Sequence, residues 1–125
     1  MLSKKKLKIK RGIPASWTDA LQSFLFWKQA QGIAPRTLED YRKHVTQFFT
    51  RYPQAYQEEN LRKSIQEYMA QPVKTATFNL RLVYLKAFFN WCVAERIFAL
   101  NLLSGFKRKK DGGRIVSIDS DILKR

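Results

Sequence analysis

Apolar positions between residues 75 and 97 recur at gaps of three and four, which is the period of one face of a helix. The residues that follow this period are Phe78, Leu82, Leu85, Phe89, Cys92 and Val93. The opposite side is also largely apolar, with Leu80, Val83, Tyr84, Ala87 and Trp91. A helix that is apolar nearly all round is normally buried by neighbours on several sides, and the four charged residues of this segment exclude a membrane span. The pattern therefore predicts the central helix of a small all-helical domain.

The same period predicts two helices at the start of the chain. The first begins near Ser16, which forms a capping pattern with Asp19, and it ends before Gly32, a residue favoured just after a helix. The second begins at Pro35, since proline suits the first helical position, and it ends before the next proline. The inward-facing residues are Trp17, Ala20, Leu21, Phe24, Leu25 and Trp27 in the first helix and Leu38, Tyr41, Val45, Phe48, Phe49 and Tyr52 in the second. Phe26 points away from the first stripe and is a candidate contact for another domain or protomer.

The remaining elements are shorter. Residues 53–59 are expected to form a polar connection, and a third helix follows over about 60–70, with Asn60 as its cap. Thr75 or Thr77 is expected to cap the central helix. After that helix, residues 98–106 have room for one short helix that Gly105 would close. The predicted fold is all-α: a compact bundle of four main helices plus a short fifth, with flexible basic tails.

The chain divides into three parts. Residues 1–13 are a lysine-rich arm without an apolar stripe, which is typical of a flexible segment. Residues 14–106 form the helical domain. Residues 107–125 begin with a charged, glycine-containing linker and continue into the opening of a new strand and helix. We therefore expect the sequence to be a piece of a longer protein that is cut at the start of its next domain.

Charge points to a polyanionic partner. The formal net charge is +14, and residues 1–11 alone carry six positive and no negative side chains. Nucleic acid fits better than a membrane, because no amphipathic helix pairs a basic face with an exposed apolar one. A domain that merely has adhesive basic tails is the alternative that charge leaves open.

Composition limits the chemistry. A single cysteine, Cys92, excludes an internal disulfide, and its place on the apolar stripe indicates a buried core residue. One histidine and one cysteine cannot supply the four ligands of a structural zinc site, and His44 is expected at the surface. No metal or other cofactor, no small-molecule substrate and no membrane contact is expected. The basic N-terminus is not followed by an apolar run, so we expect no signal peptide and a cytoplasmic location.

Two segments carry a family resemblance. Residues 32–49 resemble the second helix of the N-terminal core-binding (SAM-like) domain of tyrosine recombinases, the phage-integrase family. The residues that match in order are Gly32, Thr37, Tyr41, Val45, Phe48 and Phe49. Residues 75–101 resemble the fourth helix of that domain, through Thr77, Asn79, Arg81, Leu82, Leu85, Lys86, Phe88, Phe89, Trp91 and Asn101. The family usually has proline after that asparagine, and Leu102 replaces it here.

The resemblance implies what the chain would do. It implies binding of double-stranded DNA as the N-terminal module of a site-specific recombinase, encoded by a bacterium or phage, that integrates or recombines DNA of a mobile element together with other protomers. The tyrosine nucleophile and its Arg, Lys and His helpers lie in the family's next domain. We therefore expect no catalytic residue and no enzyme activity in this chain, although the full-length parent would be a DNA recombinase.

Residues at or near the starts of the second and fourth helices are the candidates for DNA contact. Helix starts offer free N–H groups and a positive dipole end to phosphates. Along the helices, arginine would pair with guanine and asparagine with adenine if bases are read. The predicted DNA-binding residues are Arg36, Thr37, Lys43, Lys74, Thr75, Thr77, Asn79, Arg81, Lys86, Lys107 and Arg108. Two other functions stay open: a stand-alone basic helical nucleic-acid-binding protein, and a module whose aromatic surface binds another protein.

Overall fold

The computed structural model describes residues 13–110. They form the helices α1 (Trp17–Ala30), α2 (Pro35–Arg51), α3 (Glu58–Met69) and α4 (Thr75–Ala94), and a 3₁₀ turn, η1 (Pro53–Tyr56), between α2 and α3. No strand occurs within these residues. The prediction of an all-α bundle with four main helices is therefore confirmed, whereas the predicted basic arm over residues 1–13 and the segment after residue 110 lie almost wholly outside the described part.

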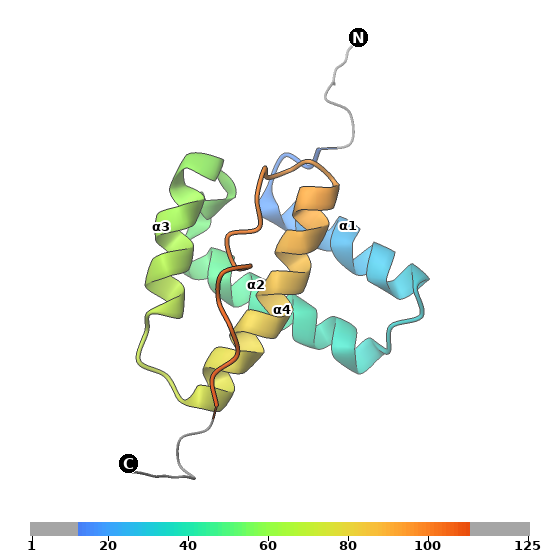
Figure 1. Cartoon of the computed structure of the whole chain (residues 1–125). Coiled ribbons are helices and arrows are strands. Elements are labelled where there is room, and N and C mark those ends of the chain that lie inside the picture. Colours follow the sequence, from blue (N-terminus) through green and yellow to red (C-terminus); the bar gives the residue numbers. More distant parts are fainter. Residues whose placement is uncertain (1–12, 111–125) are drawn as a thin grey trace, which may run out of the picture.

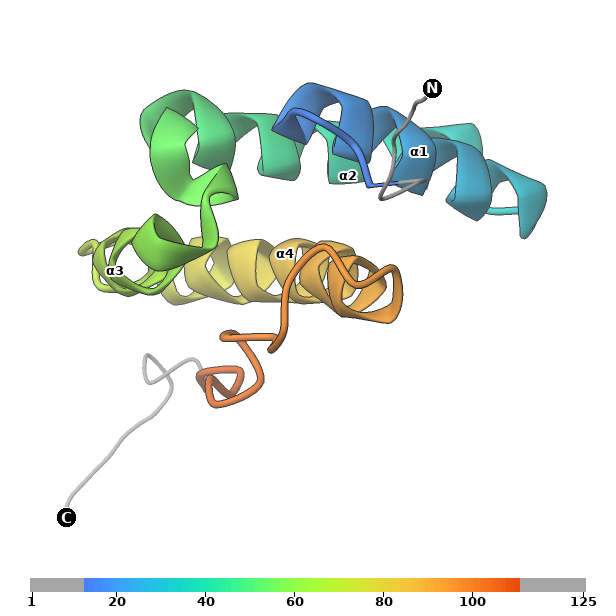
Figure 2. The ribbon, with the colours of Figure 1, turned by 90° about the horizontal axis from the view of Figure 1, so that it is seen from above.

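The helices pack in two layers (Figure 2). α1 and α2 run side by side in one layer, and α3 and α4 form the other. α4 crosses α2, so that the two helices make an X in which both N-termini lie at the lower side of the molecule in Figure 1. After α4 the chain turns and runs back along that helix, on the side away from α2.

Aromatic rings fill the space between the layers. Phe48 of α2 and Phe89 of α4 are fully buried, with ring centroids 6.0 Å apart, and Phe24 of α1 lies edge-on to Phe88 of α4 at 5.3 Å. Trp17 stacks on Phe49 at 5.3 Å. Edge-to-face pairs of this kind add to the free energy gained by burying the rings. The core therefore fixes the angle at which α2 and α4 cross.

The ends of α1 and α4 have the same geometry but different residues. Gly32 follows α1 with φ +88°, and Ile33 N–H donates to Lys28 C=O at 3.2 Å. After α4, Arg96 has φ +64°, and Ile97 N–H donates to Cys92 C=O at 2.8 Å. Both are Schellman ends, in which a left-handed residue lets the chain satisfy the last carbonyls. The central helix therefore ends at Ala94, earlier than the predicted Ile97.

Several local predictions are settled by the structure. Ser16 caps α1, since its Oγ accepts from Asp19 N–H at 3.3 Å, and Pro35 is the first residue of α2. The prediction that Thr75 or Thr77 caps α4 was wrong: Lys74 is the N-cap and no side chain caps that end. Nor does Asn60 cap α3, which begins two residues earlier.

Two other expectations are corrected. Residues 98–106 form turns instead of a short helix, because Asn101 draws the chain inward through its side chain, which bonds to Asn90 Oδ1, Lys86 C=O and Leu103 N–H. The extra helical element is η1, within the segment expected to be a polar connection. Trp27 is 44% exposed instead of inward-facing, whereas Phe26 is 74% exposed as expected.

Tyr56 closes the domain at its N-terminal side. Its hydroxyl lies 2.7 Å from Pro14 C=O and donates to it. Its ring contacts Phe49 and Phe98 edge-on, with centroids 6.3 and 5.8 Å away. The chain before α1 is thereby anchored to η1.

Exchanging Arg96 for glycine tests the Schellman end of α4. A side chain at φ +64° crowds its own backbone, and glycine does not. We expect Arg96→Gly to raise the free energy of unfolding by roughly 0.5–1 kcal/mol in urea titrations. Gly32→Ala is the mirror control: a Cβ there would meet no atom within 4 Å, so a loss of about 1 kcal/mol would be purely conformational. An unchanged or lower stability of Arg96→Gly would contradict this account.

Candidate nucleic-acid interface

Acidic and basic residues are distributed unevenly among the described helices. α4 contains no acidic residue, and α2 carries four basic and two acidic ones. α3 has the opposite balance, with three acidic and two basic residues. The side of the molecule formed by α2, α4 and the segment after them is therefore the cationic side.

The starts of α2 and α4 are unlike those of the other helices. α1 and α3 have acidic residues in the first turn, and Ser16 also caps α1. The starts of α2 and α4 have neither an acidic residue in the first turn nor a side-chain cap. Their first N–H groups and the positive ends of their dipoles are therefore left for an external anion.

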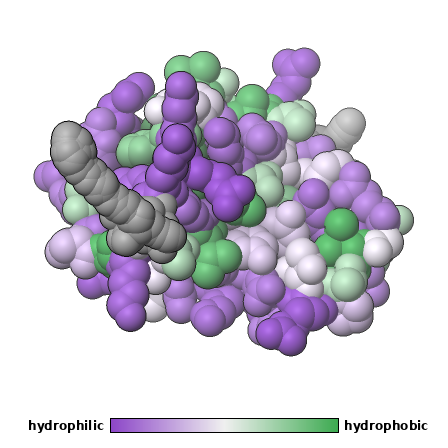
Figure 3. Space-filling model, turned by 60° about the horizontal axis from the view of Figure 1, so that its bottom comes forward, coloured by the Kyte–Doolittle hydropathy of each residue, from purple (hydrophilic) through white to green (hydrophobic). Residues whose placement is uncertain are grey.

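Both starts carry the predicted residues on the same side of the molecule. Arg36 and Lys74 are exposed, and Thr37, Thr75 and Thr77 are half-buried. Figure 3 turns this side forward and shows hydrophilic side chains over most of it, with separate apolar patches between them. The arrangement that phosphate binding at two helix starts requires is present.

α2 and α4 also contact each other further along, through Tyr84 of α4. The Tyr84 hydroxyl donates to Asp40 Oδ2 at 3.4 Å, and the His44 ring stacks on the Tyr84 ring with centroids 4.8 Å apart. Tyr41 meets Tyr84 edge-on at 5.1 Å. Burial, and then the charge of Asp40 and its hydrogen bond, raise the pKa of Tyr84, so its hydroxyl stays a donor. Asp40 thus accepts one hydrogen bond from α4.

The outer face of α4 is an apolar strip. Ala76, Leu80 and Val83 follow one another at helical spacing, and Leu80 and Val83 are 48% and 44% exposed. The strip lies in a hollow of about 420 Å³ that Tyr84 borders on one side and Arg108 on the other. The expectation that α4 is covered on all sides is therefore not met at these two residues.

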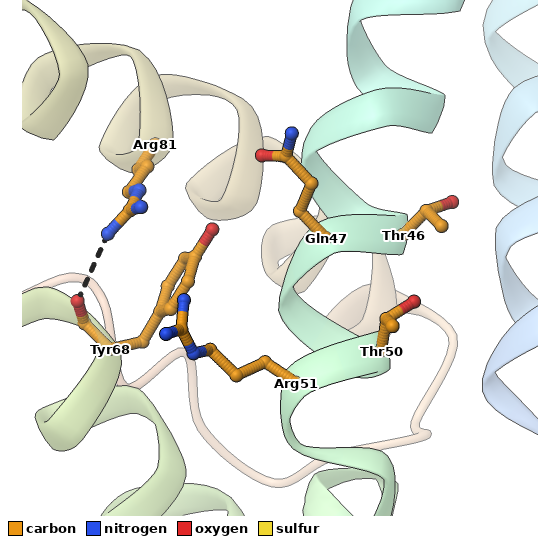
Figure 4. Close-up of a pocket in the computed structure, with 6 residues that line it drawn as sticks. All are labelled: Thr46, Gln47, Thr50, Arg51, Tyr68 and Arg81. Atoms are coloured by element: carbon orange, nitrogen blue, oxygen red, sulfur yellow. Dashed lines mark hydrogen bonds between the residues drawn. The ribbon is translucent and has the colours of Figure 1, made fainter.

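A second hollow lies between α2, α3 and α4 (Figure 4). It measures about 540 Å³, and its lining contains two arginines, Arg51 and Arg81, and no carboxylate. Arg81 stacks on the Tyr68 ring at 4.2 Å and donates to Gln71 Oε1 at 2.9 Å. Figure 4 also shows its bond to the Tyr68 C=O, at 3.4 Å. Arg81 is thus fixed by α3 while its charge borders an open space.

Asn79 is engaged by the chain itself. Its Nδ2 donates to Lys109 C=O at 2.8 Å, and Lys109 N–H donates to its Oδ1 at 2.7 Å. The Lys109 ammonium lies 4.0 Å from the centre of the Phe78 ring. The segment 107–110 is held beside the start of α4 by these contacts, with all four residues exposed.

The predicted residues fall into three groups. Arg36, Thr37, Lys74, Thr75 and Thr77 gather at the helix starts, with Lys43 further along α2. Arg81 lies in the second hollow. Lys107 and Arg108 belong to the segment that Asn79 holds, and Lys86 occupies the same flank of α4, where its C=O accepts from Asn101. Whether any of them contacts DNA stays a prediction.

Sequence reasoning did not identify Arg51, which borders the second hollow, or the contact of Lys109 with Asn79. Arg51 is the last residue of α2, and four residues before it Gln47 lies on the predicted outer face, so helical spacing could have identified it. Lys109 was recognised only as one charge of a linker. Its contact with Asn79 joins residues thirty apart, and no spacing rule gives such a pair.

His44 is half-buried on the α2 side of this surface. Its Nδ1 is buried and has no hydrogen-bond partner within residues 13–110. Burial lowers its pKa, and Lys43 and Arg81 lower it further, against an opposing effect of Asp40. The neutral ring is therefore favoured in the folded protein.

Other chemistry finds little support in the part of the chain that the structure describes. Within residues 13–110, no three His, Cys, Asp or Glu side chains lie together as a metal site would need. No helix described there is long and apolar enough to cross a membrane. Cys92 is fully buried, as predicted, and burial raises the pKa of its thiol.

The lowered pKa of His44 predicts a pH dependence of stability. In the unfolded state His44 takes up its proton near pH 6.5, and in the folded state it does so only at lower pH. The contribution of neutral His44 to the free energy of unfolding is therefore present above pH 6.5 and is lost as the pH falls below it. We expect the free energy of unfolding to fall between pH 7 and 5.5, by less than the roughly 1.4 kcal/mol per pH unit of one full proton. His44→Phe keeps a stacked ring and should make the free energy of unfolding depend less on pH in this interval, because the chain has no other histidine. If the free energy of unfolding falls equally with pH in both proteins, groups other than His44 cause the pH dependence.

Comparison with known proteins identifies the domain. The family model of the phage integrase N-terminal SAM-like domain matches residues 20–96, which include most of the four helices and both helix starts. Neither the comparison with curated proteins nor that with solved structures found a significant match. The match, the four-helix fold and the paired helix starts agree: the chain belongs to the phage integrase N-terminal SAM-like domain family.

Proposed function

We propose that the chain binds double-stranded DNA as the N-terminal core-binding module of a tyrosine-type site-specific recombinase that integrates or recombines DNA. One observation carries the proposal: the helix starts of α2 and α4 lie on one side of the domain and are free of acidic residues and side-chain caps. The family supports it, since this domain binds DNA in tyrosine recombinases. The protein acts in the cytoplasm, with other protomers on the same DNA.

α4 enters the major groove in this proposal. An α-helix with its side chains is about 10–12 Å wide, and the major groove of B-DNA is about 12 Å wide. The exposed strip of Leu80 and Val83 then faces the base edges. Cations stand on both flanks of the strip: Arg36 and Lys43 on the α2 side, and residues 107–110 on the other. They meet the two phosphate backbones that border the groove.

The individual roles follow from position. Arg36 and Lys74 contact phosphates, and the hydroxyls of Thr37, Thr75 and Thr77 reinforce the N–H groups beside them. Arg81 and Arg51 offer a further phosphate position in the hollow between α2 and α4, and Lys86, Lys107 and Arg108 extend the path along α4. Base reading by Asn79 or Arg81 would require each side chain to leave its present partners.

The chain does not cut DNA in this proposal. A tyrosine nucleophile must lose its proton near neutral pH, and burial instead raises the pKa of Tyr68 and Tyr84, and that of Tyr56 to about 12. Arg51 and Arg81 lie beside Tyr68 and His44 stacks on Tyr84, but in this family the nucleophile and its Arg, Lys and His helpers belong to the next domain. Cleavage belongs to the catalytic domain of the longer recombinase.

Replacing Arg36 by alanine tests the phosphate path. A phosphate contact releases about one counterion, so the logarithm of the binding constant depends less steeply on the logarithm of salt concentration by about 0.9. We expect Arg36→Ala to weaken binding to all duplexes alike and to flatten the slope by about that amount, measured by fluorescence anisotropy from 50 to 200 mM salt. Lys74→Ala should do the same.

Arg62→Ala is the matched control, because Arg62 is an exposed arginine on the acidic helix α3. It should leave the slope unchanged. If Arg62→Ala and Arg36→Ala flatten the slope equally, binding is non-specific attraction to net charge and the helix starts are not the site. If the unsubstituted chain shows no salt-dependent binding, the proposed function is wrong.

A further inference from the structure

We infer that Asn79 is a positioning residue, which holds the cations of residues 107–110 in place as one wall of the DNA-binding surface. The inference rests on the proposed function, and it says how the chain places the cations on one flank of α4. Its basis is the pair of hydrogen bonds between the Asn79 amide and the backbone of Lys109, at 2.8 and 2.7 Å. We call this pair the Asn79 clasp.

The clasp binds the backbone of Lys109 and uses no side chain of residues 107–110. An asparagine amide carries one acceptor and two donors, and here Oδ1 and Nδ2 pair with both polar groups of one residue. The Lys109 side chain adds a cation–π contact with Phe78, which α4 buries in the core. Arg108, next in the chain, borders the hollow over Leu80 and Val83. The clasp thus fixes a basic segment beside the exposed strip.

The same amide atoms cannot read a base while the clasp is closed. Asparagine recognises adenine by accepting from N6 and donating to N7, which uses Oδ1 and Nδ2 together. Both atoms are occupied by Lys109. Reading adenine would therefore release the segment 107–110 and its four positive charges.

The clasped segment faces outward. Lys107, Arg108, Lys109 and Lys110 are all exposed, and the two ion pairs found within residues 13–110 involve other cations. Four neighbouring cations repel one another, so fixing them together costs free energy that a nearby anion offsets. A DNA backbone supplies such an anion at regular spacing.

The clasp itself is tested without DNA. The Lys109 amide should exchange slowly with deuterium in the unsubstituted chain and rapidly in Asn79→Ala, while amides in the middle of α4 stay protected in both. Thermal unfolding of the variant checks that the fold is kept. A Lys109 amide that exchanges freely in the unsubstituted chain would show that the clasp does not persist in solution, and the inference would fail on its own.

The role in binding is tested by a double-mutant cycle. The cycle compares Asn79→Ala in the unsubstituted chain and in a neutralised chain that carries Lys107→Gln, Arg108→Gln, Lys109→Gln and Lys110→Gln. These four substitutions remove the positive charges and keep the backbone groups to which Asn79 bonds. Asn79→Ala should flatten the salt slope by roughly two to three units, more than the loss of one direct contact. In the neutralised background it should change the slope by less than about 0.3, because the clasp then holds no charge.

Asn90→Ala is the matched control, since Asn90 lies on the same flank of α4 and bonds to Asn101 at 2.7 Å without holding a cation. It should leave the slope within about 0.5 of the original. An equal effect of Asn79→Ala and Asn90→Ala would mean general loosening of the segment and would overturn the inference.

Two further outcomes decide between roles. If Asn79→Ala binds DNA more tightly, the segment 107–110 covers α4 in the unsubstituted chain. If Asn79→Ala weakens binding only to particular DNA sequences, and still does so in the neutralised background, Asn79 reads a base. Either result overturns the inference. Failure of the unsubstituted chain to bind DNA with salt dependence overturns the proposed function, and the DNA role of the clasp with it. The exchange experiment keeps these cases distinguishable.

Discussion

The crossing of α2 and α4 is the constraint on which the rest depends. Two helices joined by rings such as Phe48 and Phe89 cannot slide or rotate without opening a cavity, because interiors are packed as tightly as organic crystals. The crossing brings two helix starts, separated by a third helix in the sequence, to one side. The relative position of the two helix starts is thus set by the aromatic core.

The four helix starts also differ in charge. Acidic residues occupy the first turns of α1 and α3, where they complement the helix dipoles, and they are missing from the first turns of α2 and α4. Stability alone would favour acids and caps at all four ends. Their absence at two ends leaves these N–H groups without a side-chain partner, at some cost to the isolated domain.

The architecture could be predicted well from the sequence, whereas the details of the surface could not. The period of apolar residues identified four helices, because burial of Phe78, Leu82 and Phe89 imposes a spacing that can be counted. Helix ends were less certain: Arg96 takes the left-handed position that Gly32 takes elsewhere, and nothing in arginine predicts it. The role of Asn79 was beyond reach, since its partner depends on how the chain folds back after α4.

The bond between Tyr56 and Pro14 has a geometric consequence. It ties the root of the N-terminal arm to η1, at the end of the molecule opposite the starts of α2 and α4, while residue 110 emerges beside them (Figure 1). The 20 residues of α4 make these ends about 30 Å apart. The described part of the chain therefore begins at one end of α4 and leaves its basic segment, residues 107–110, at the other.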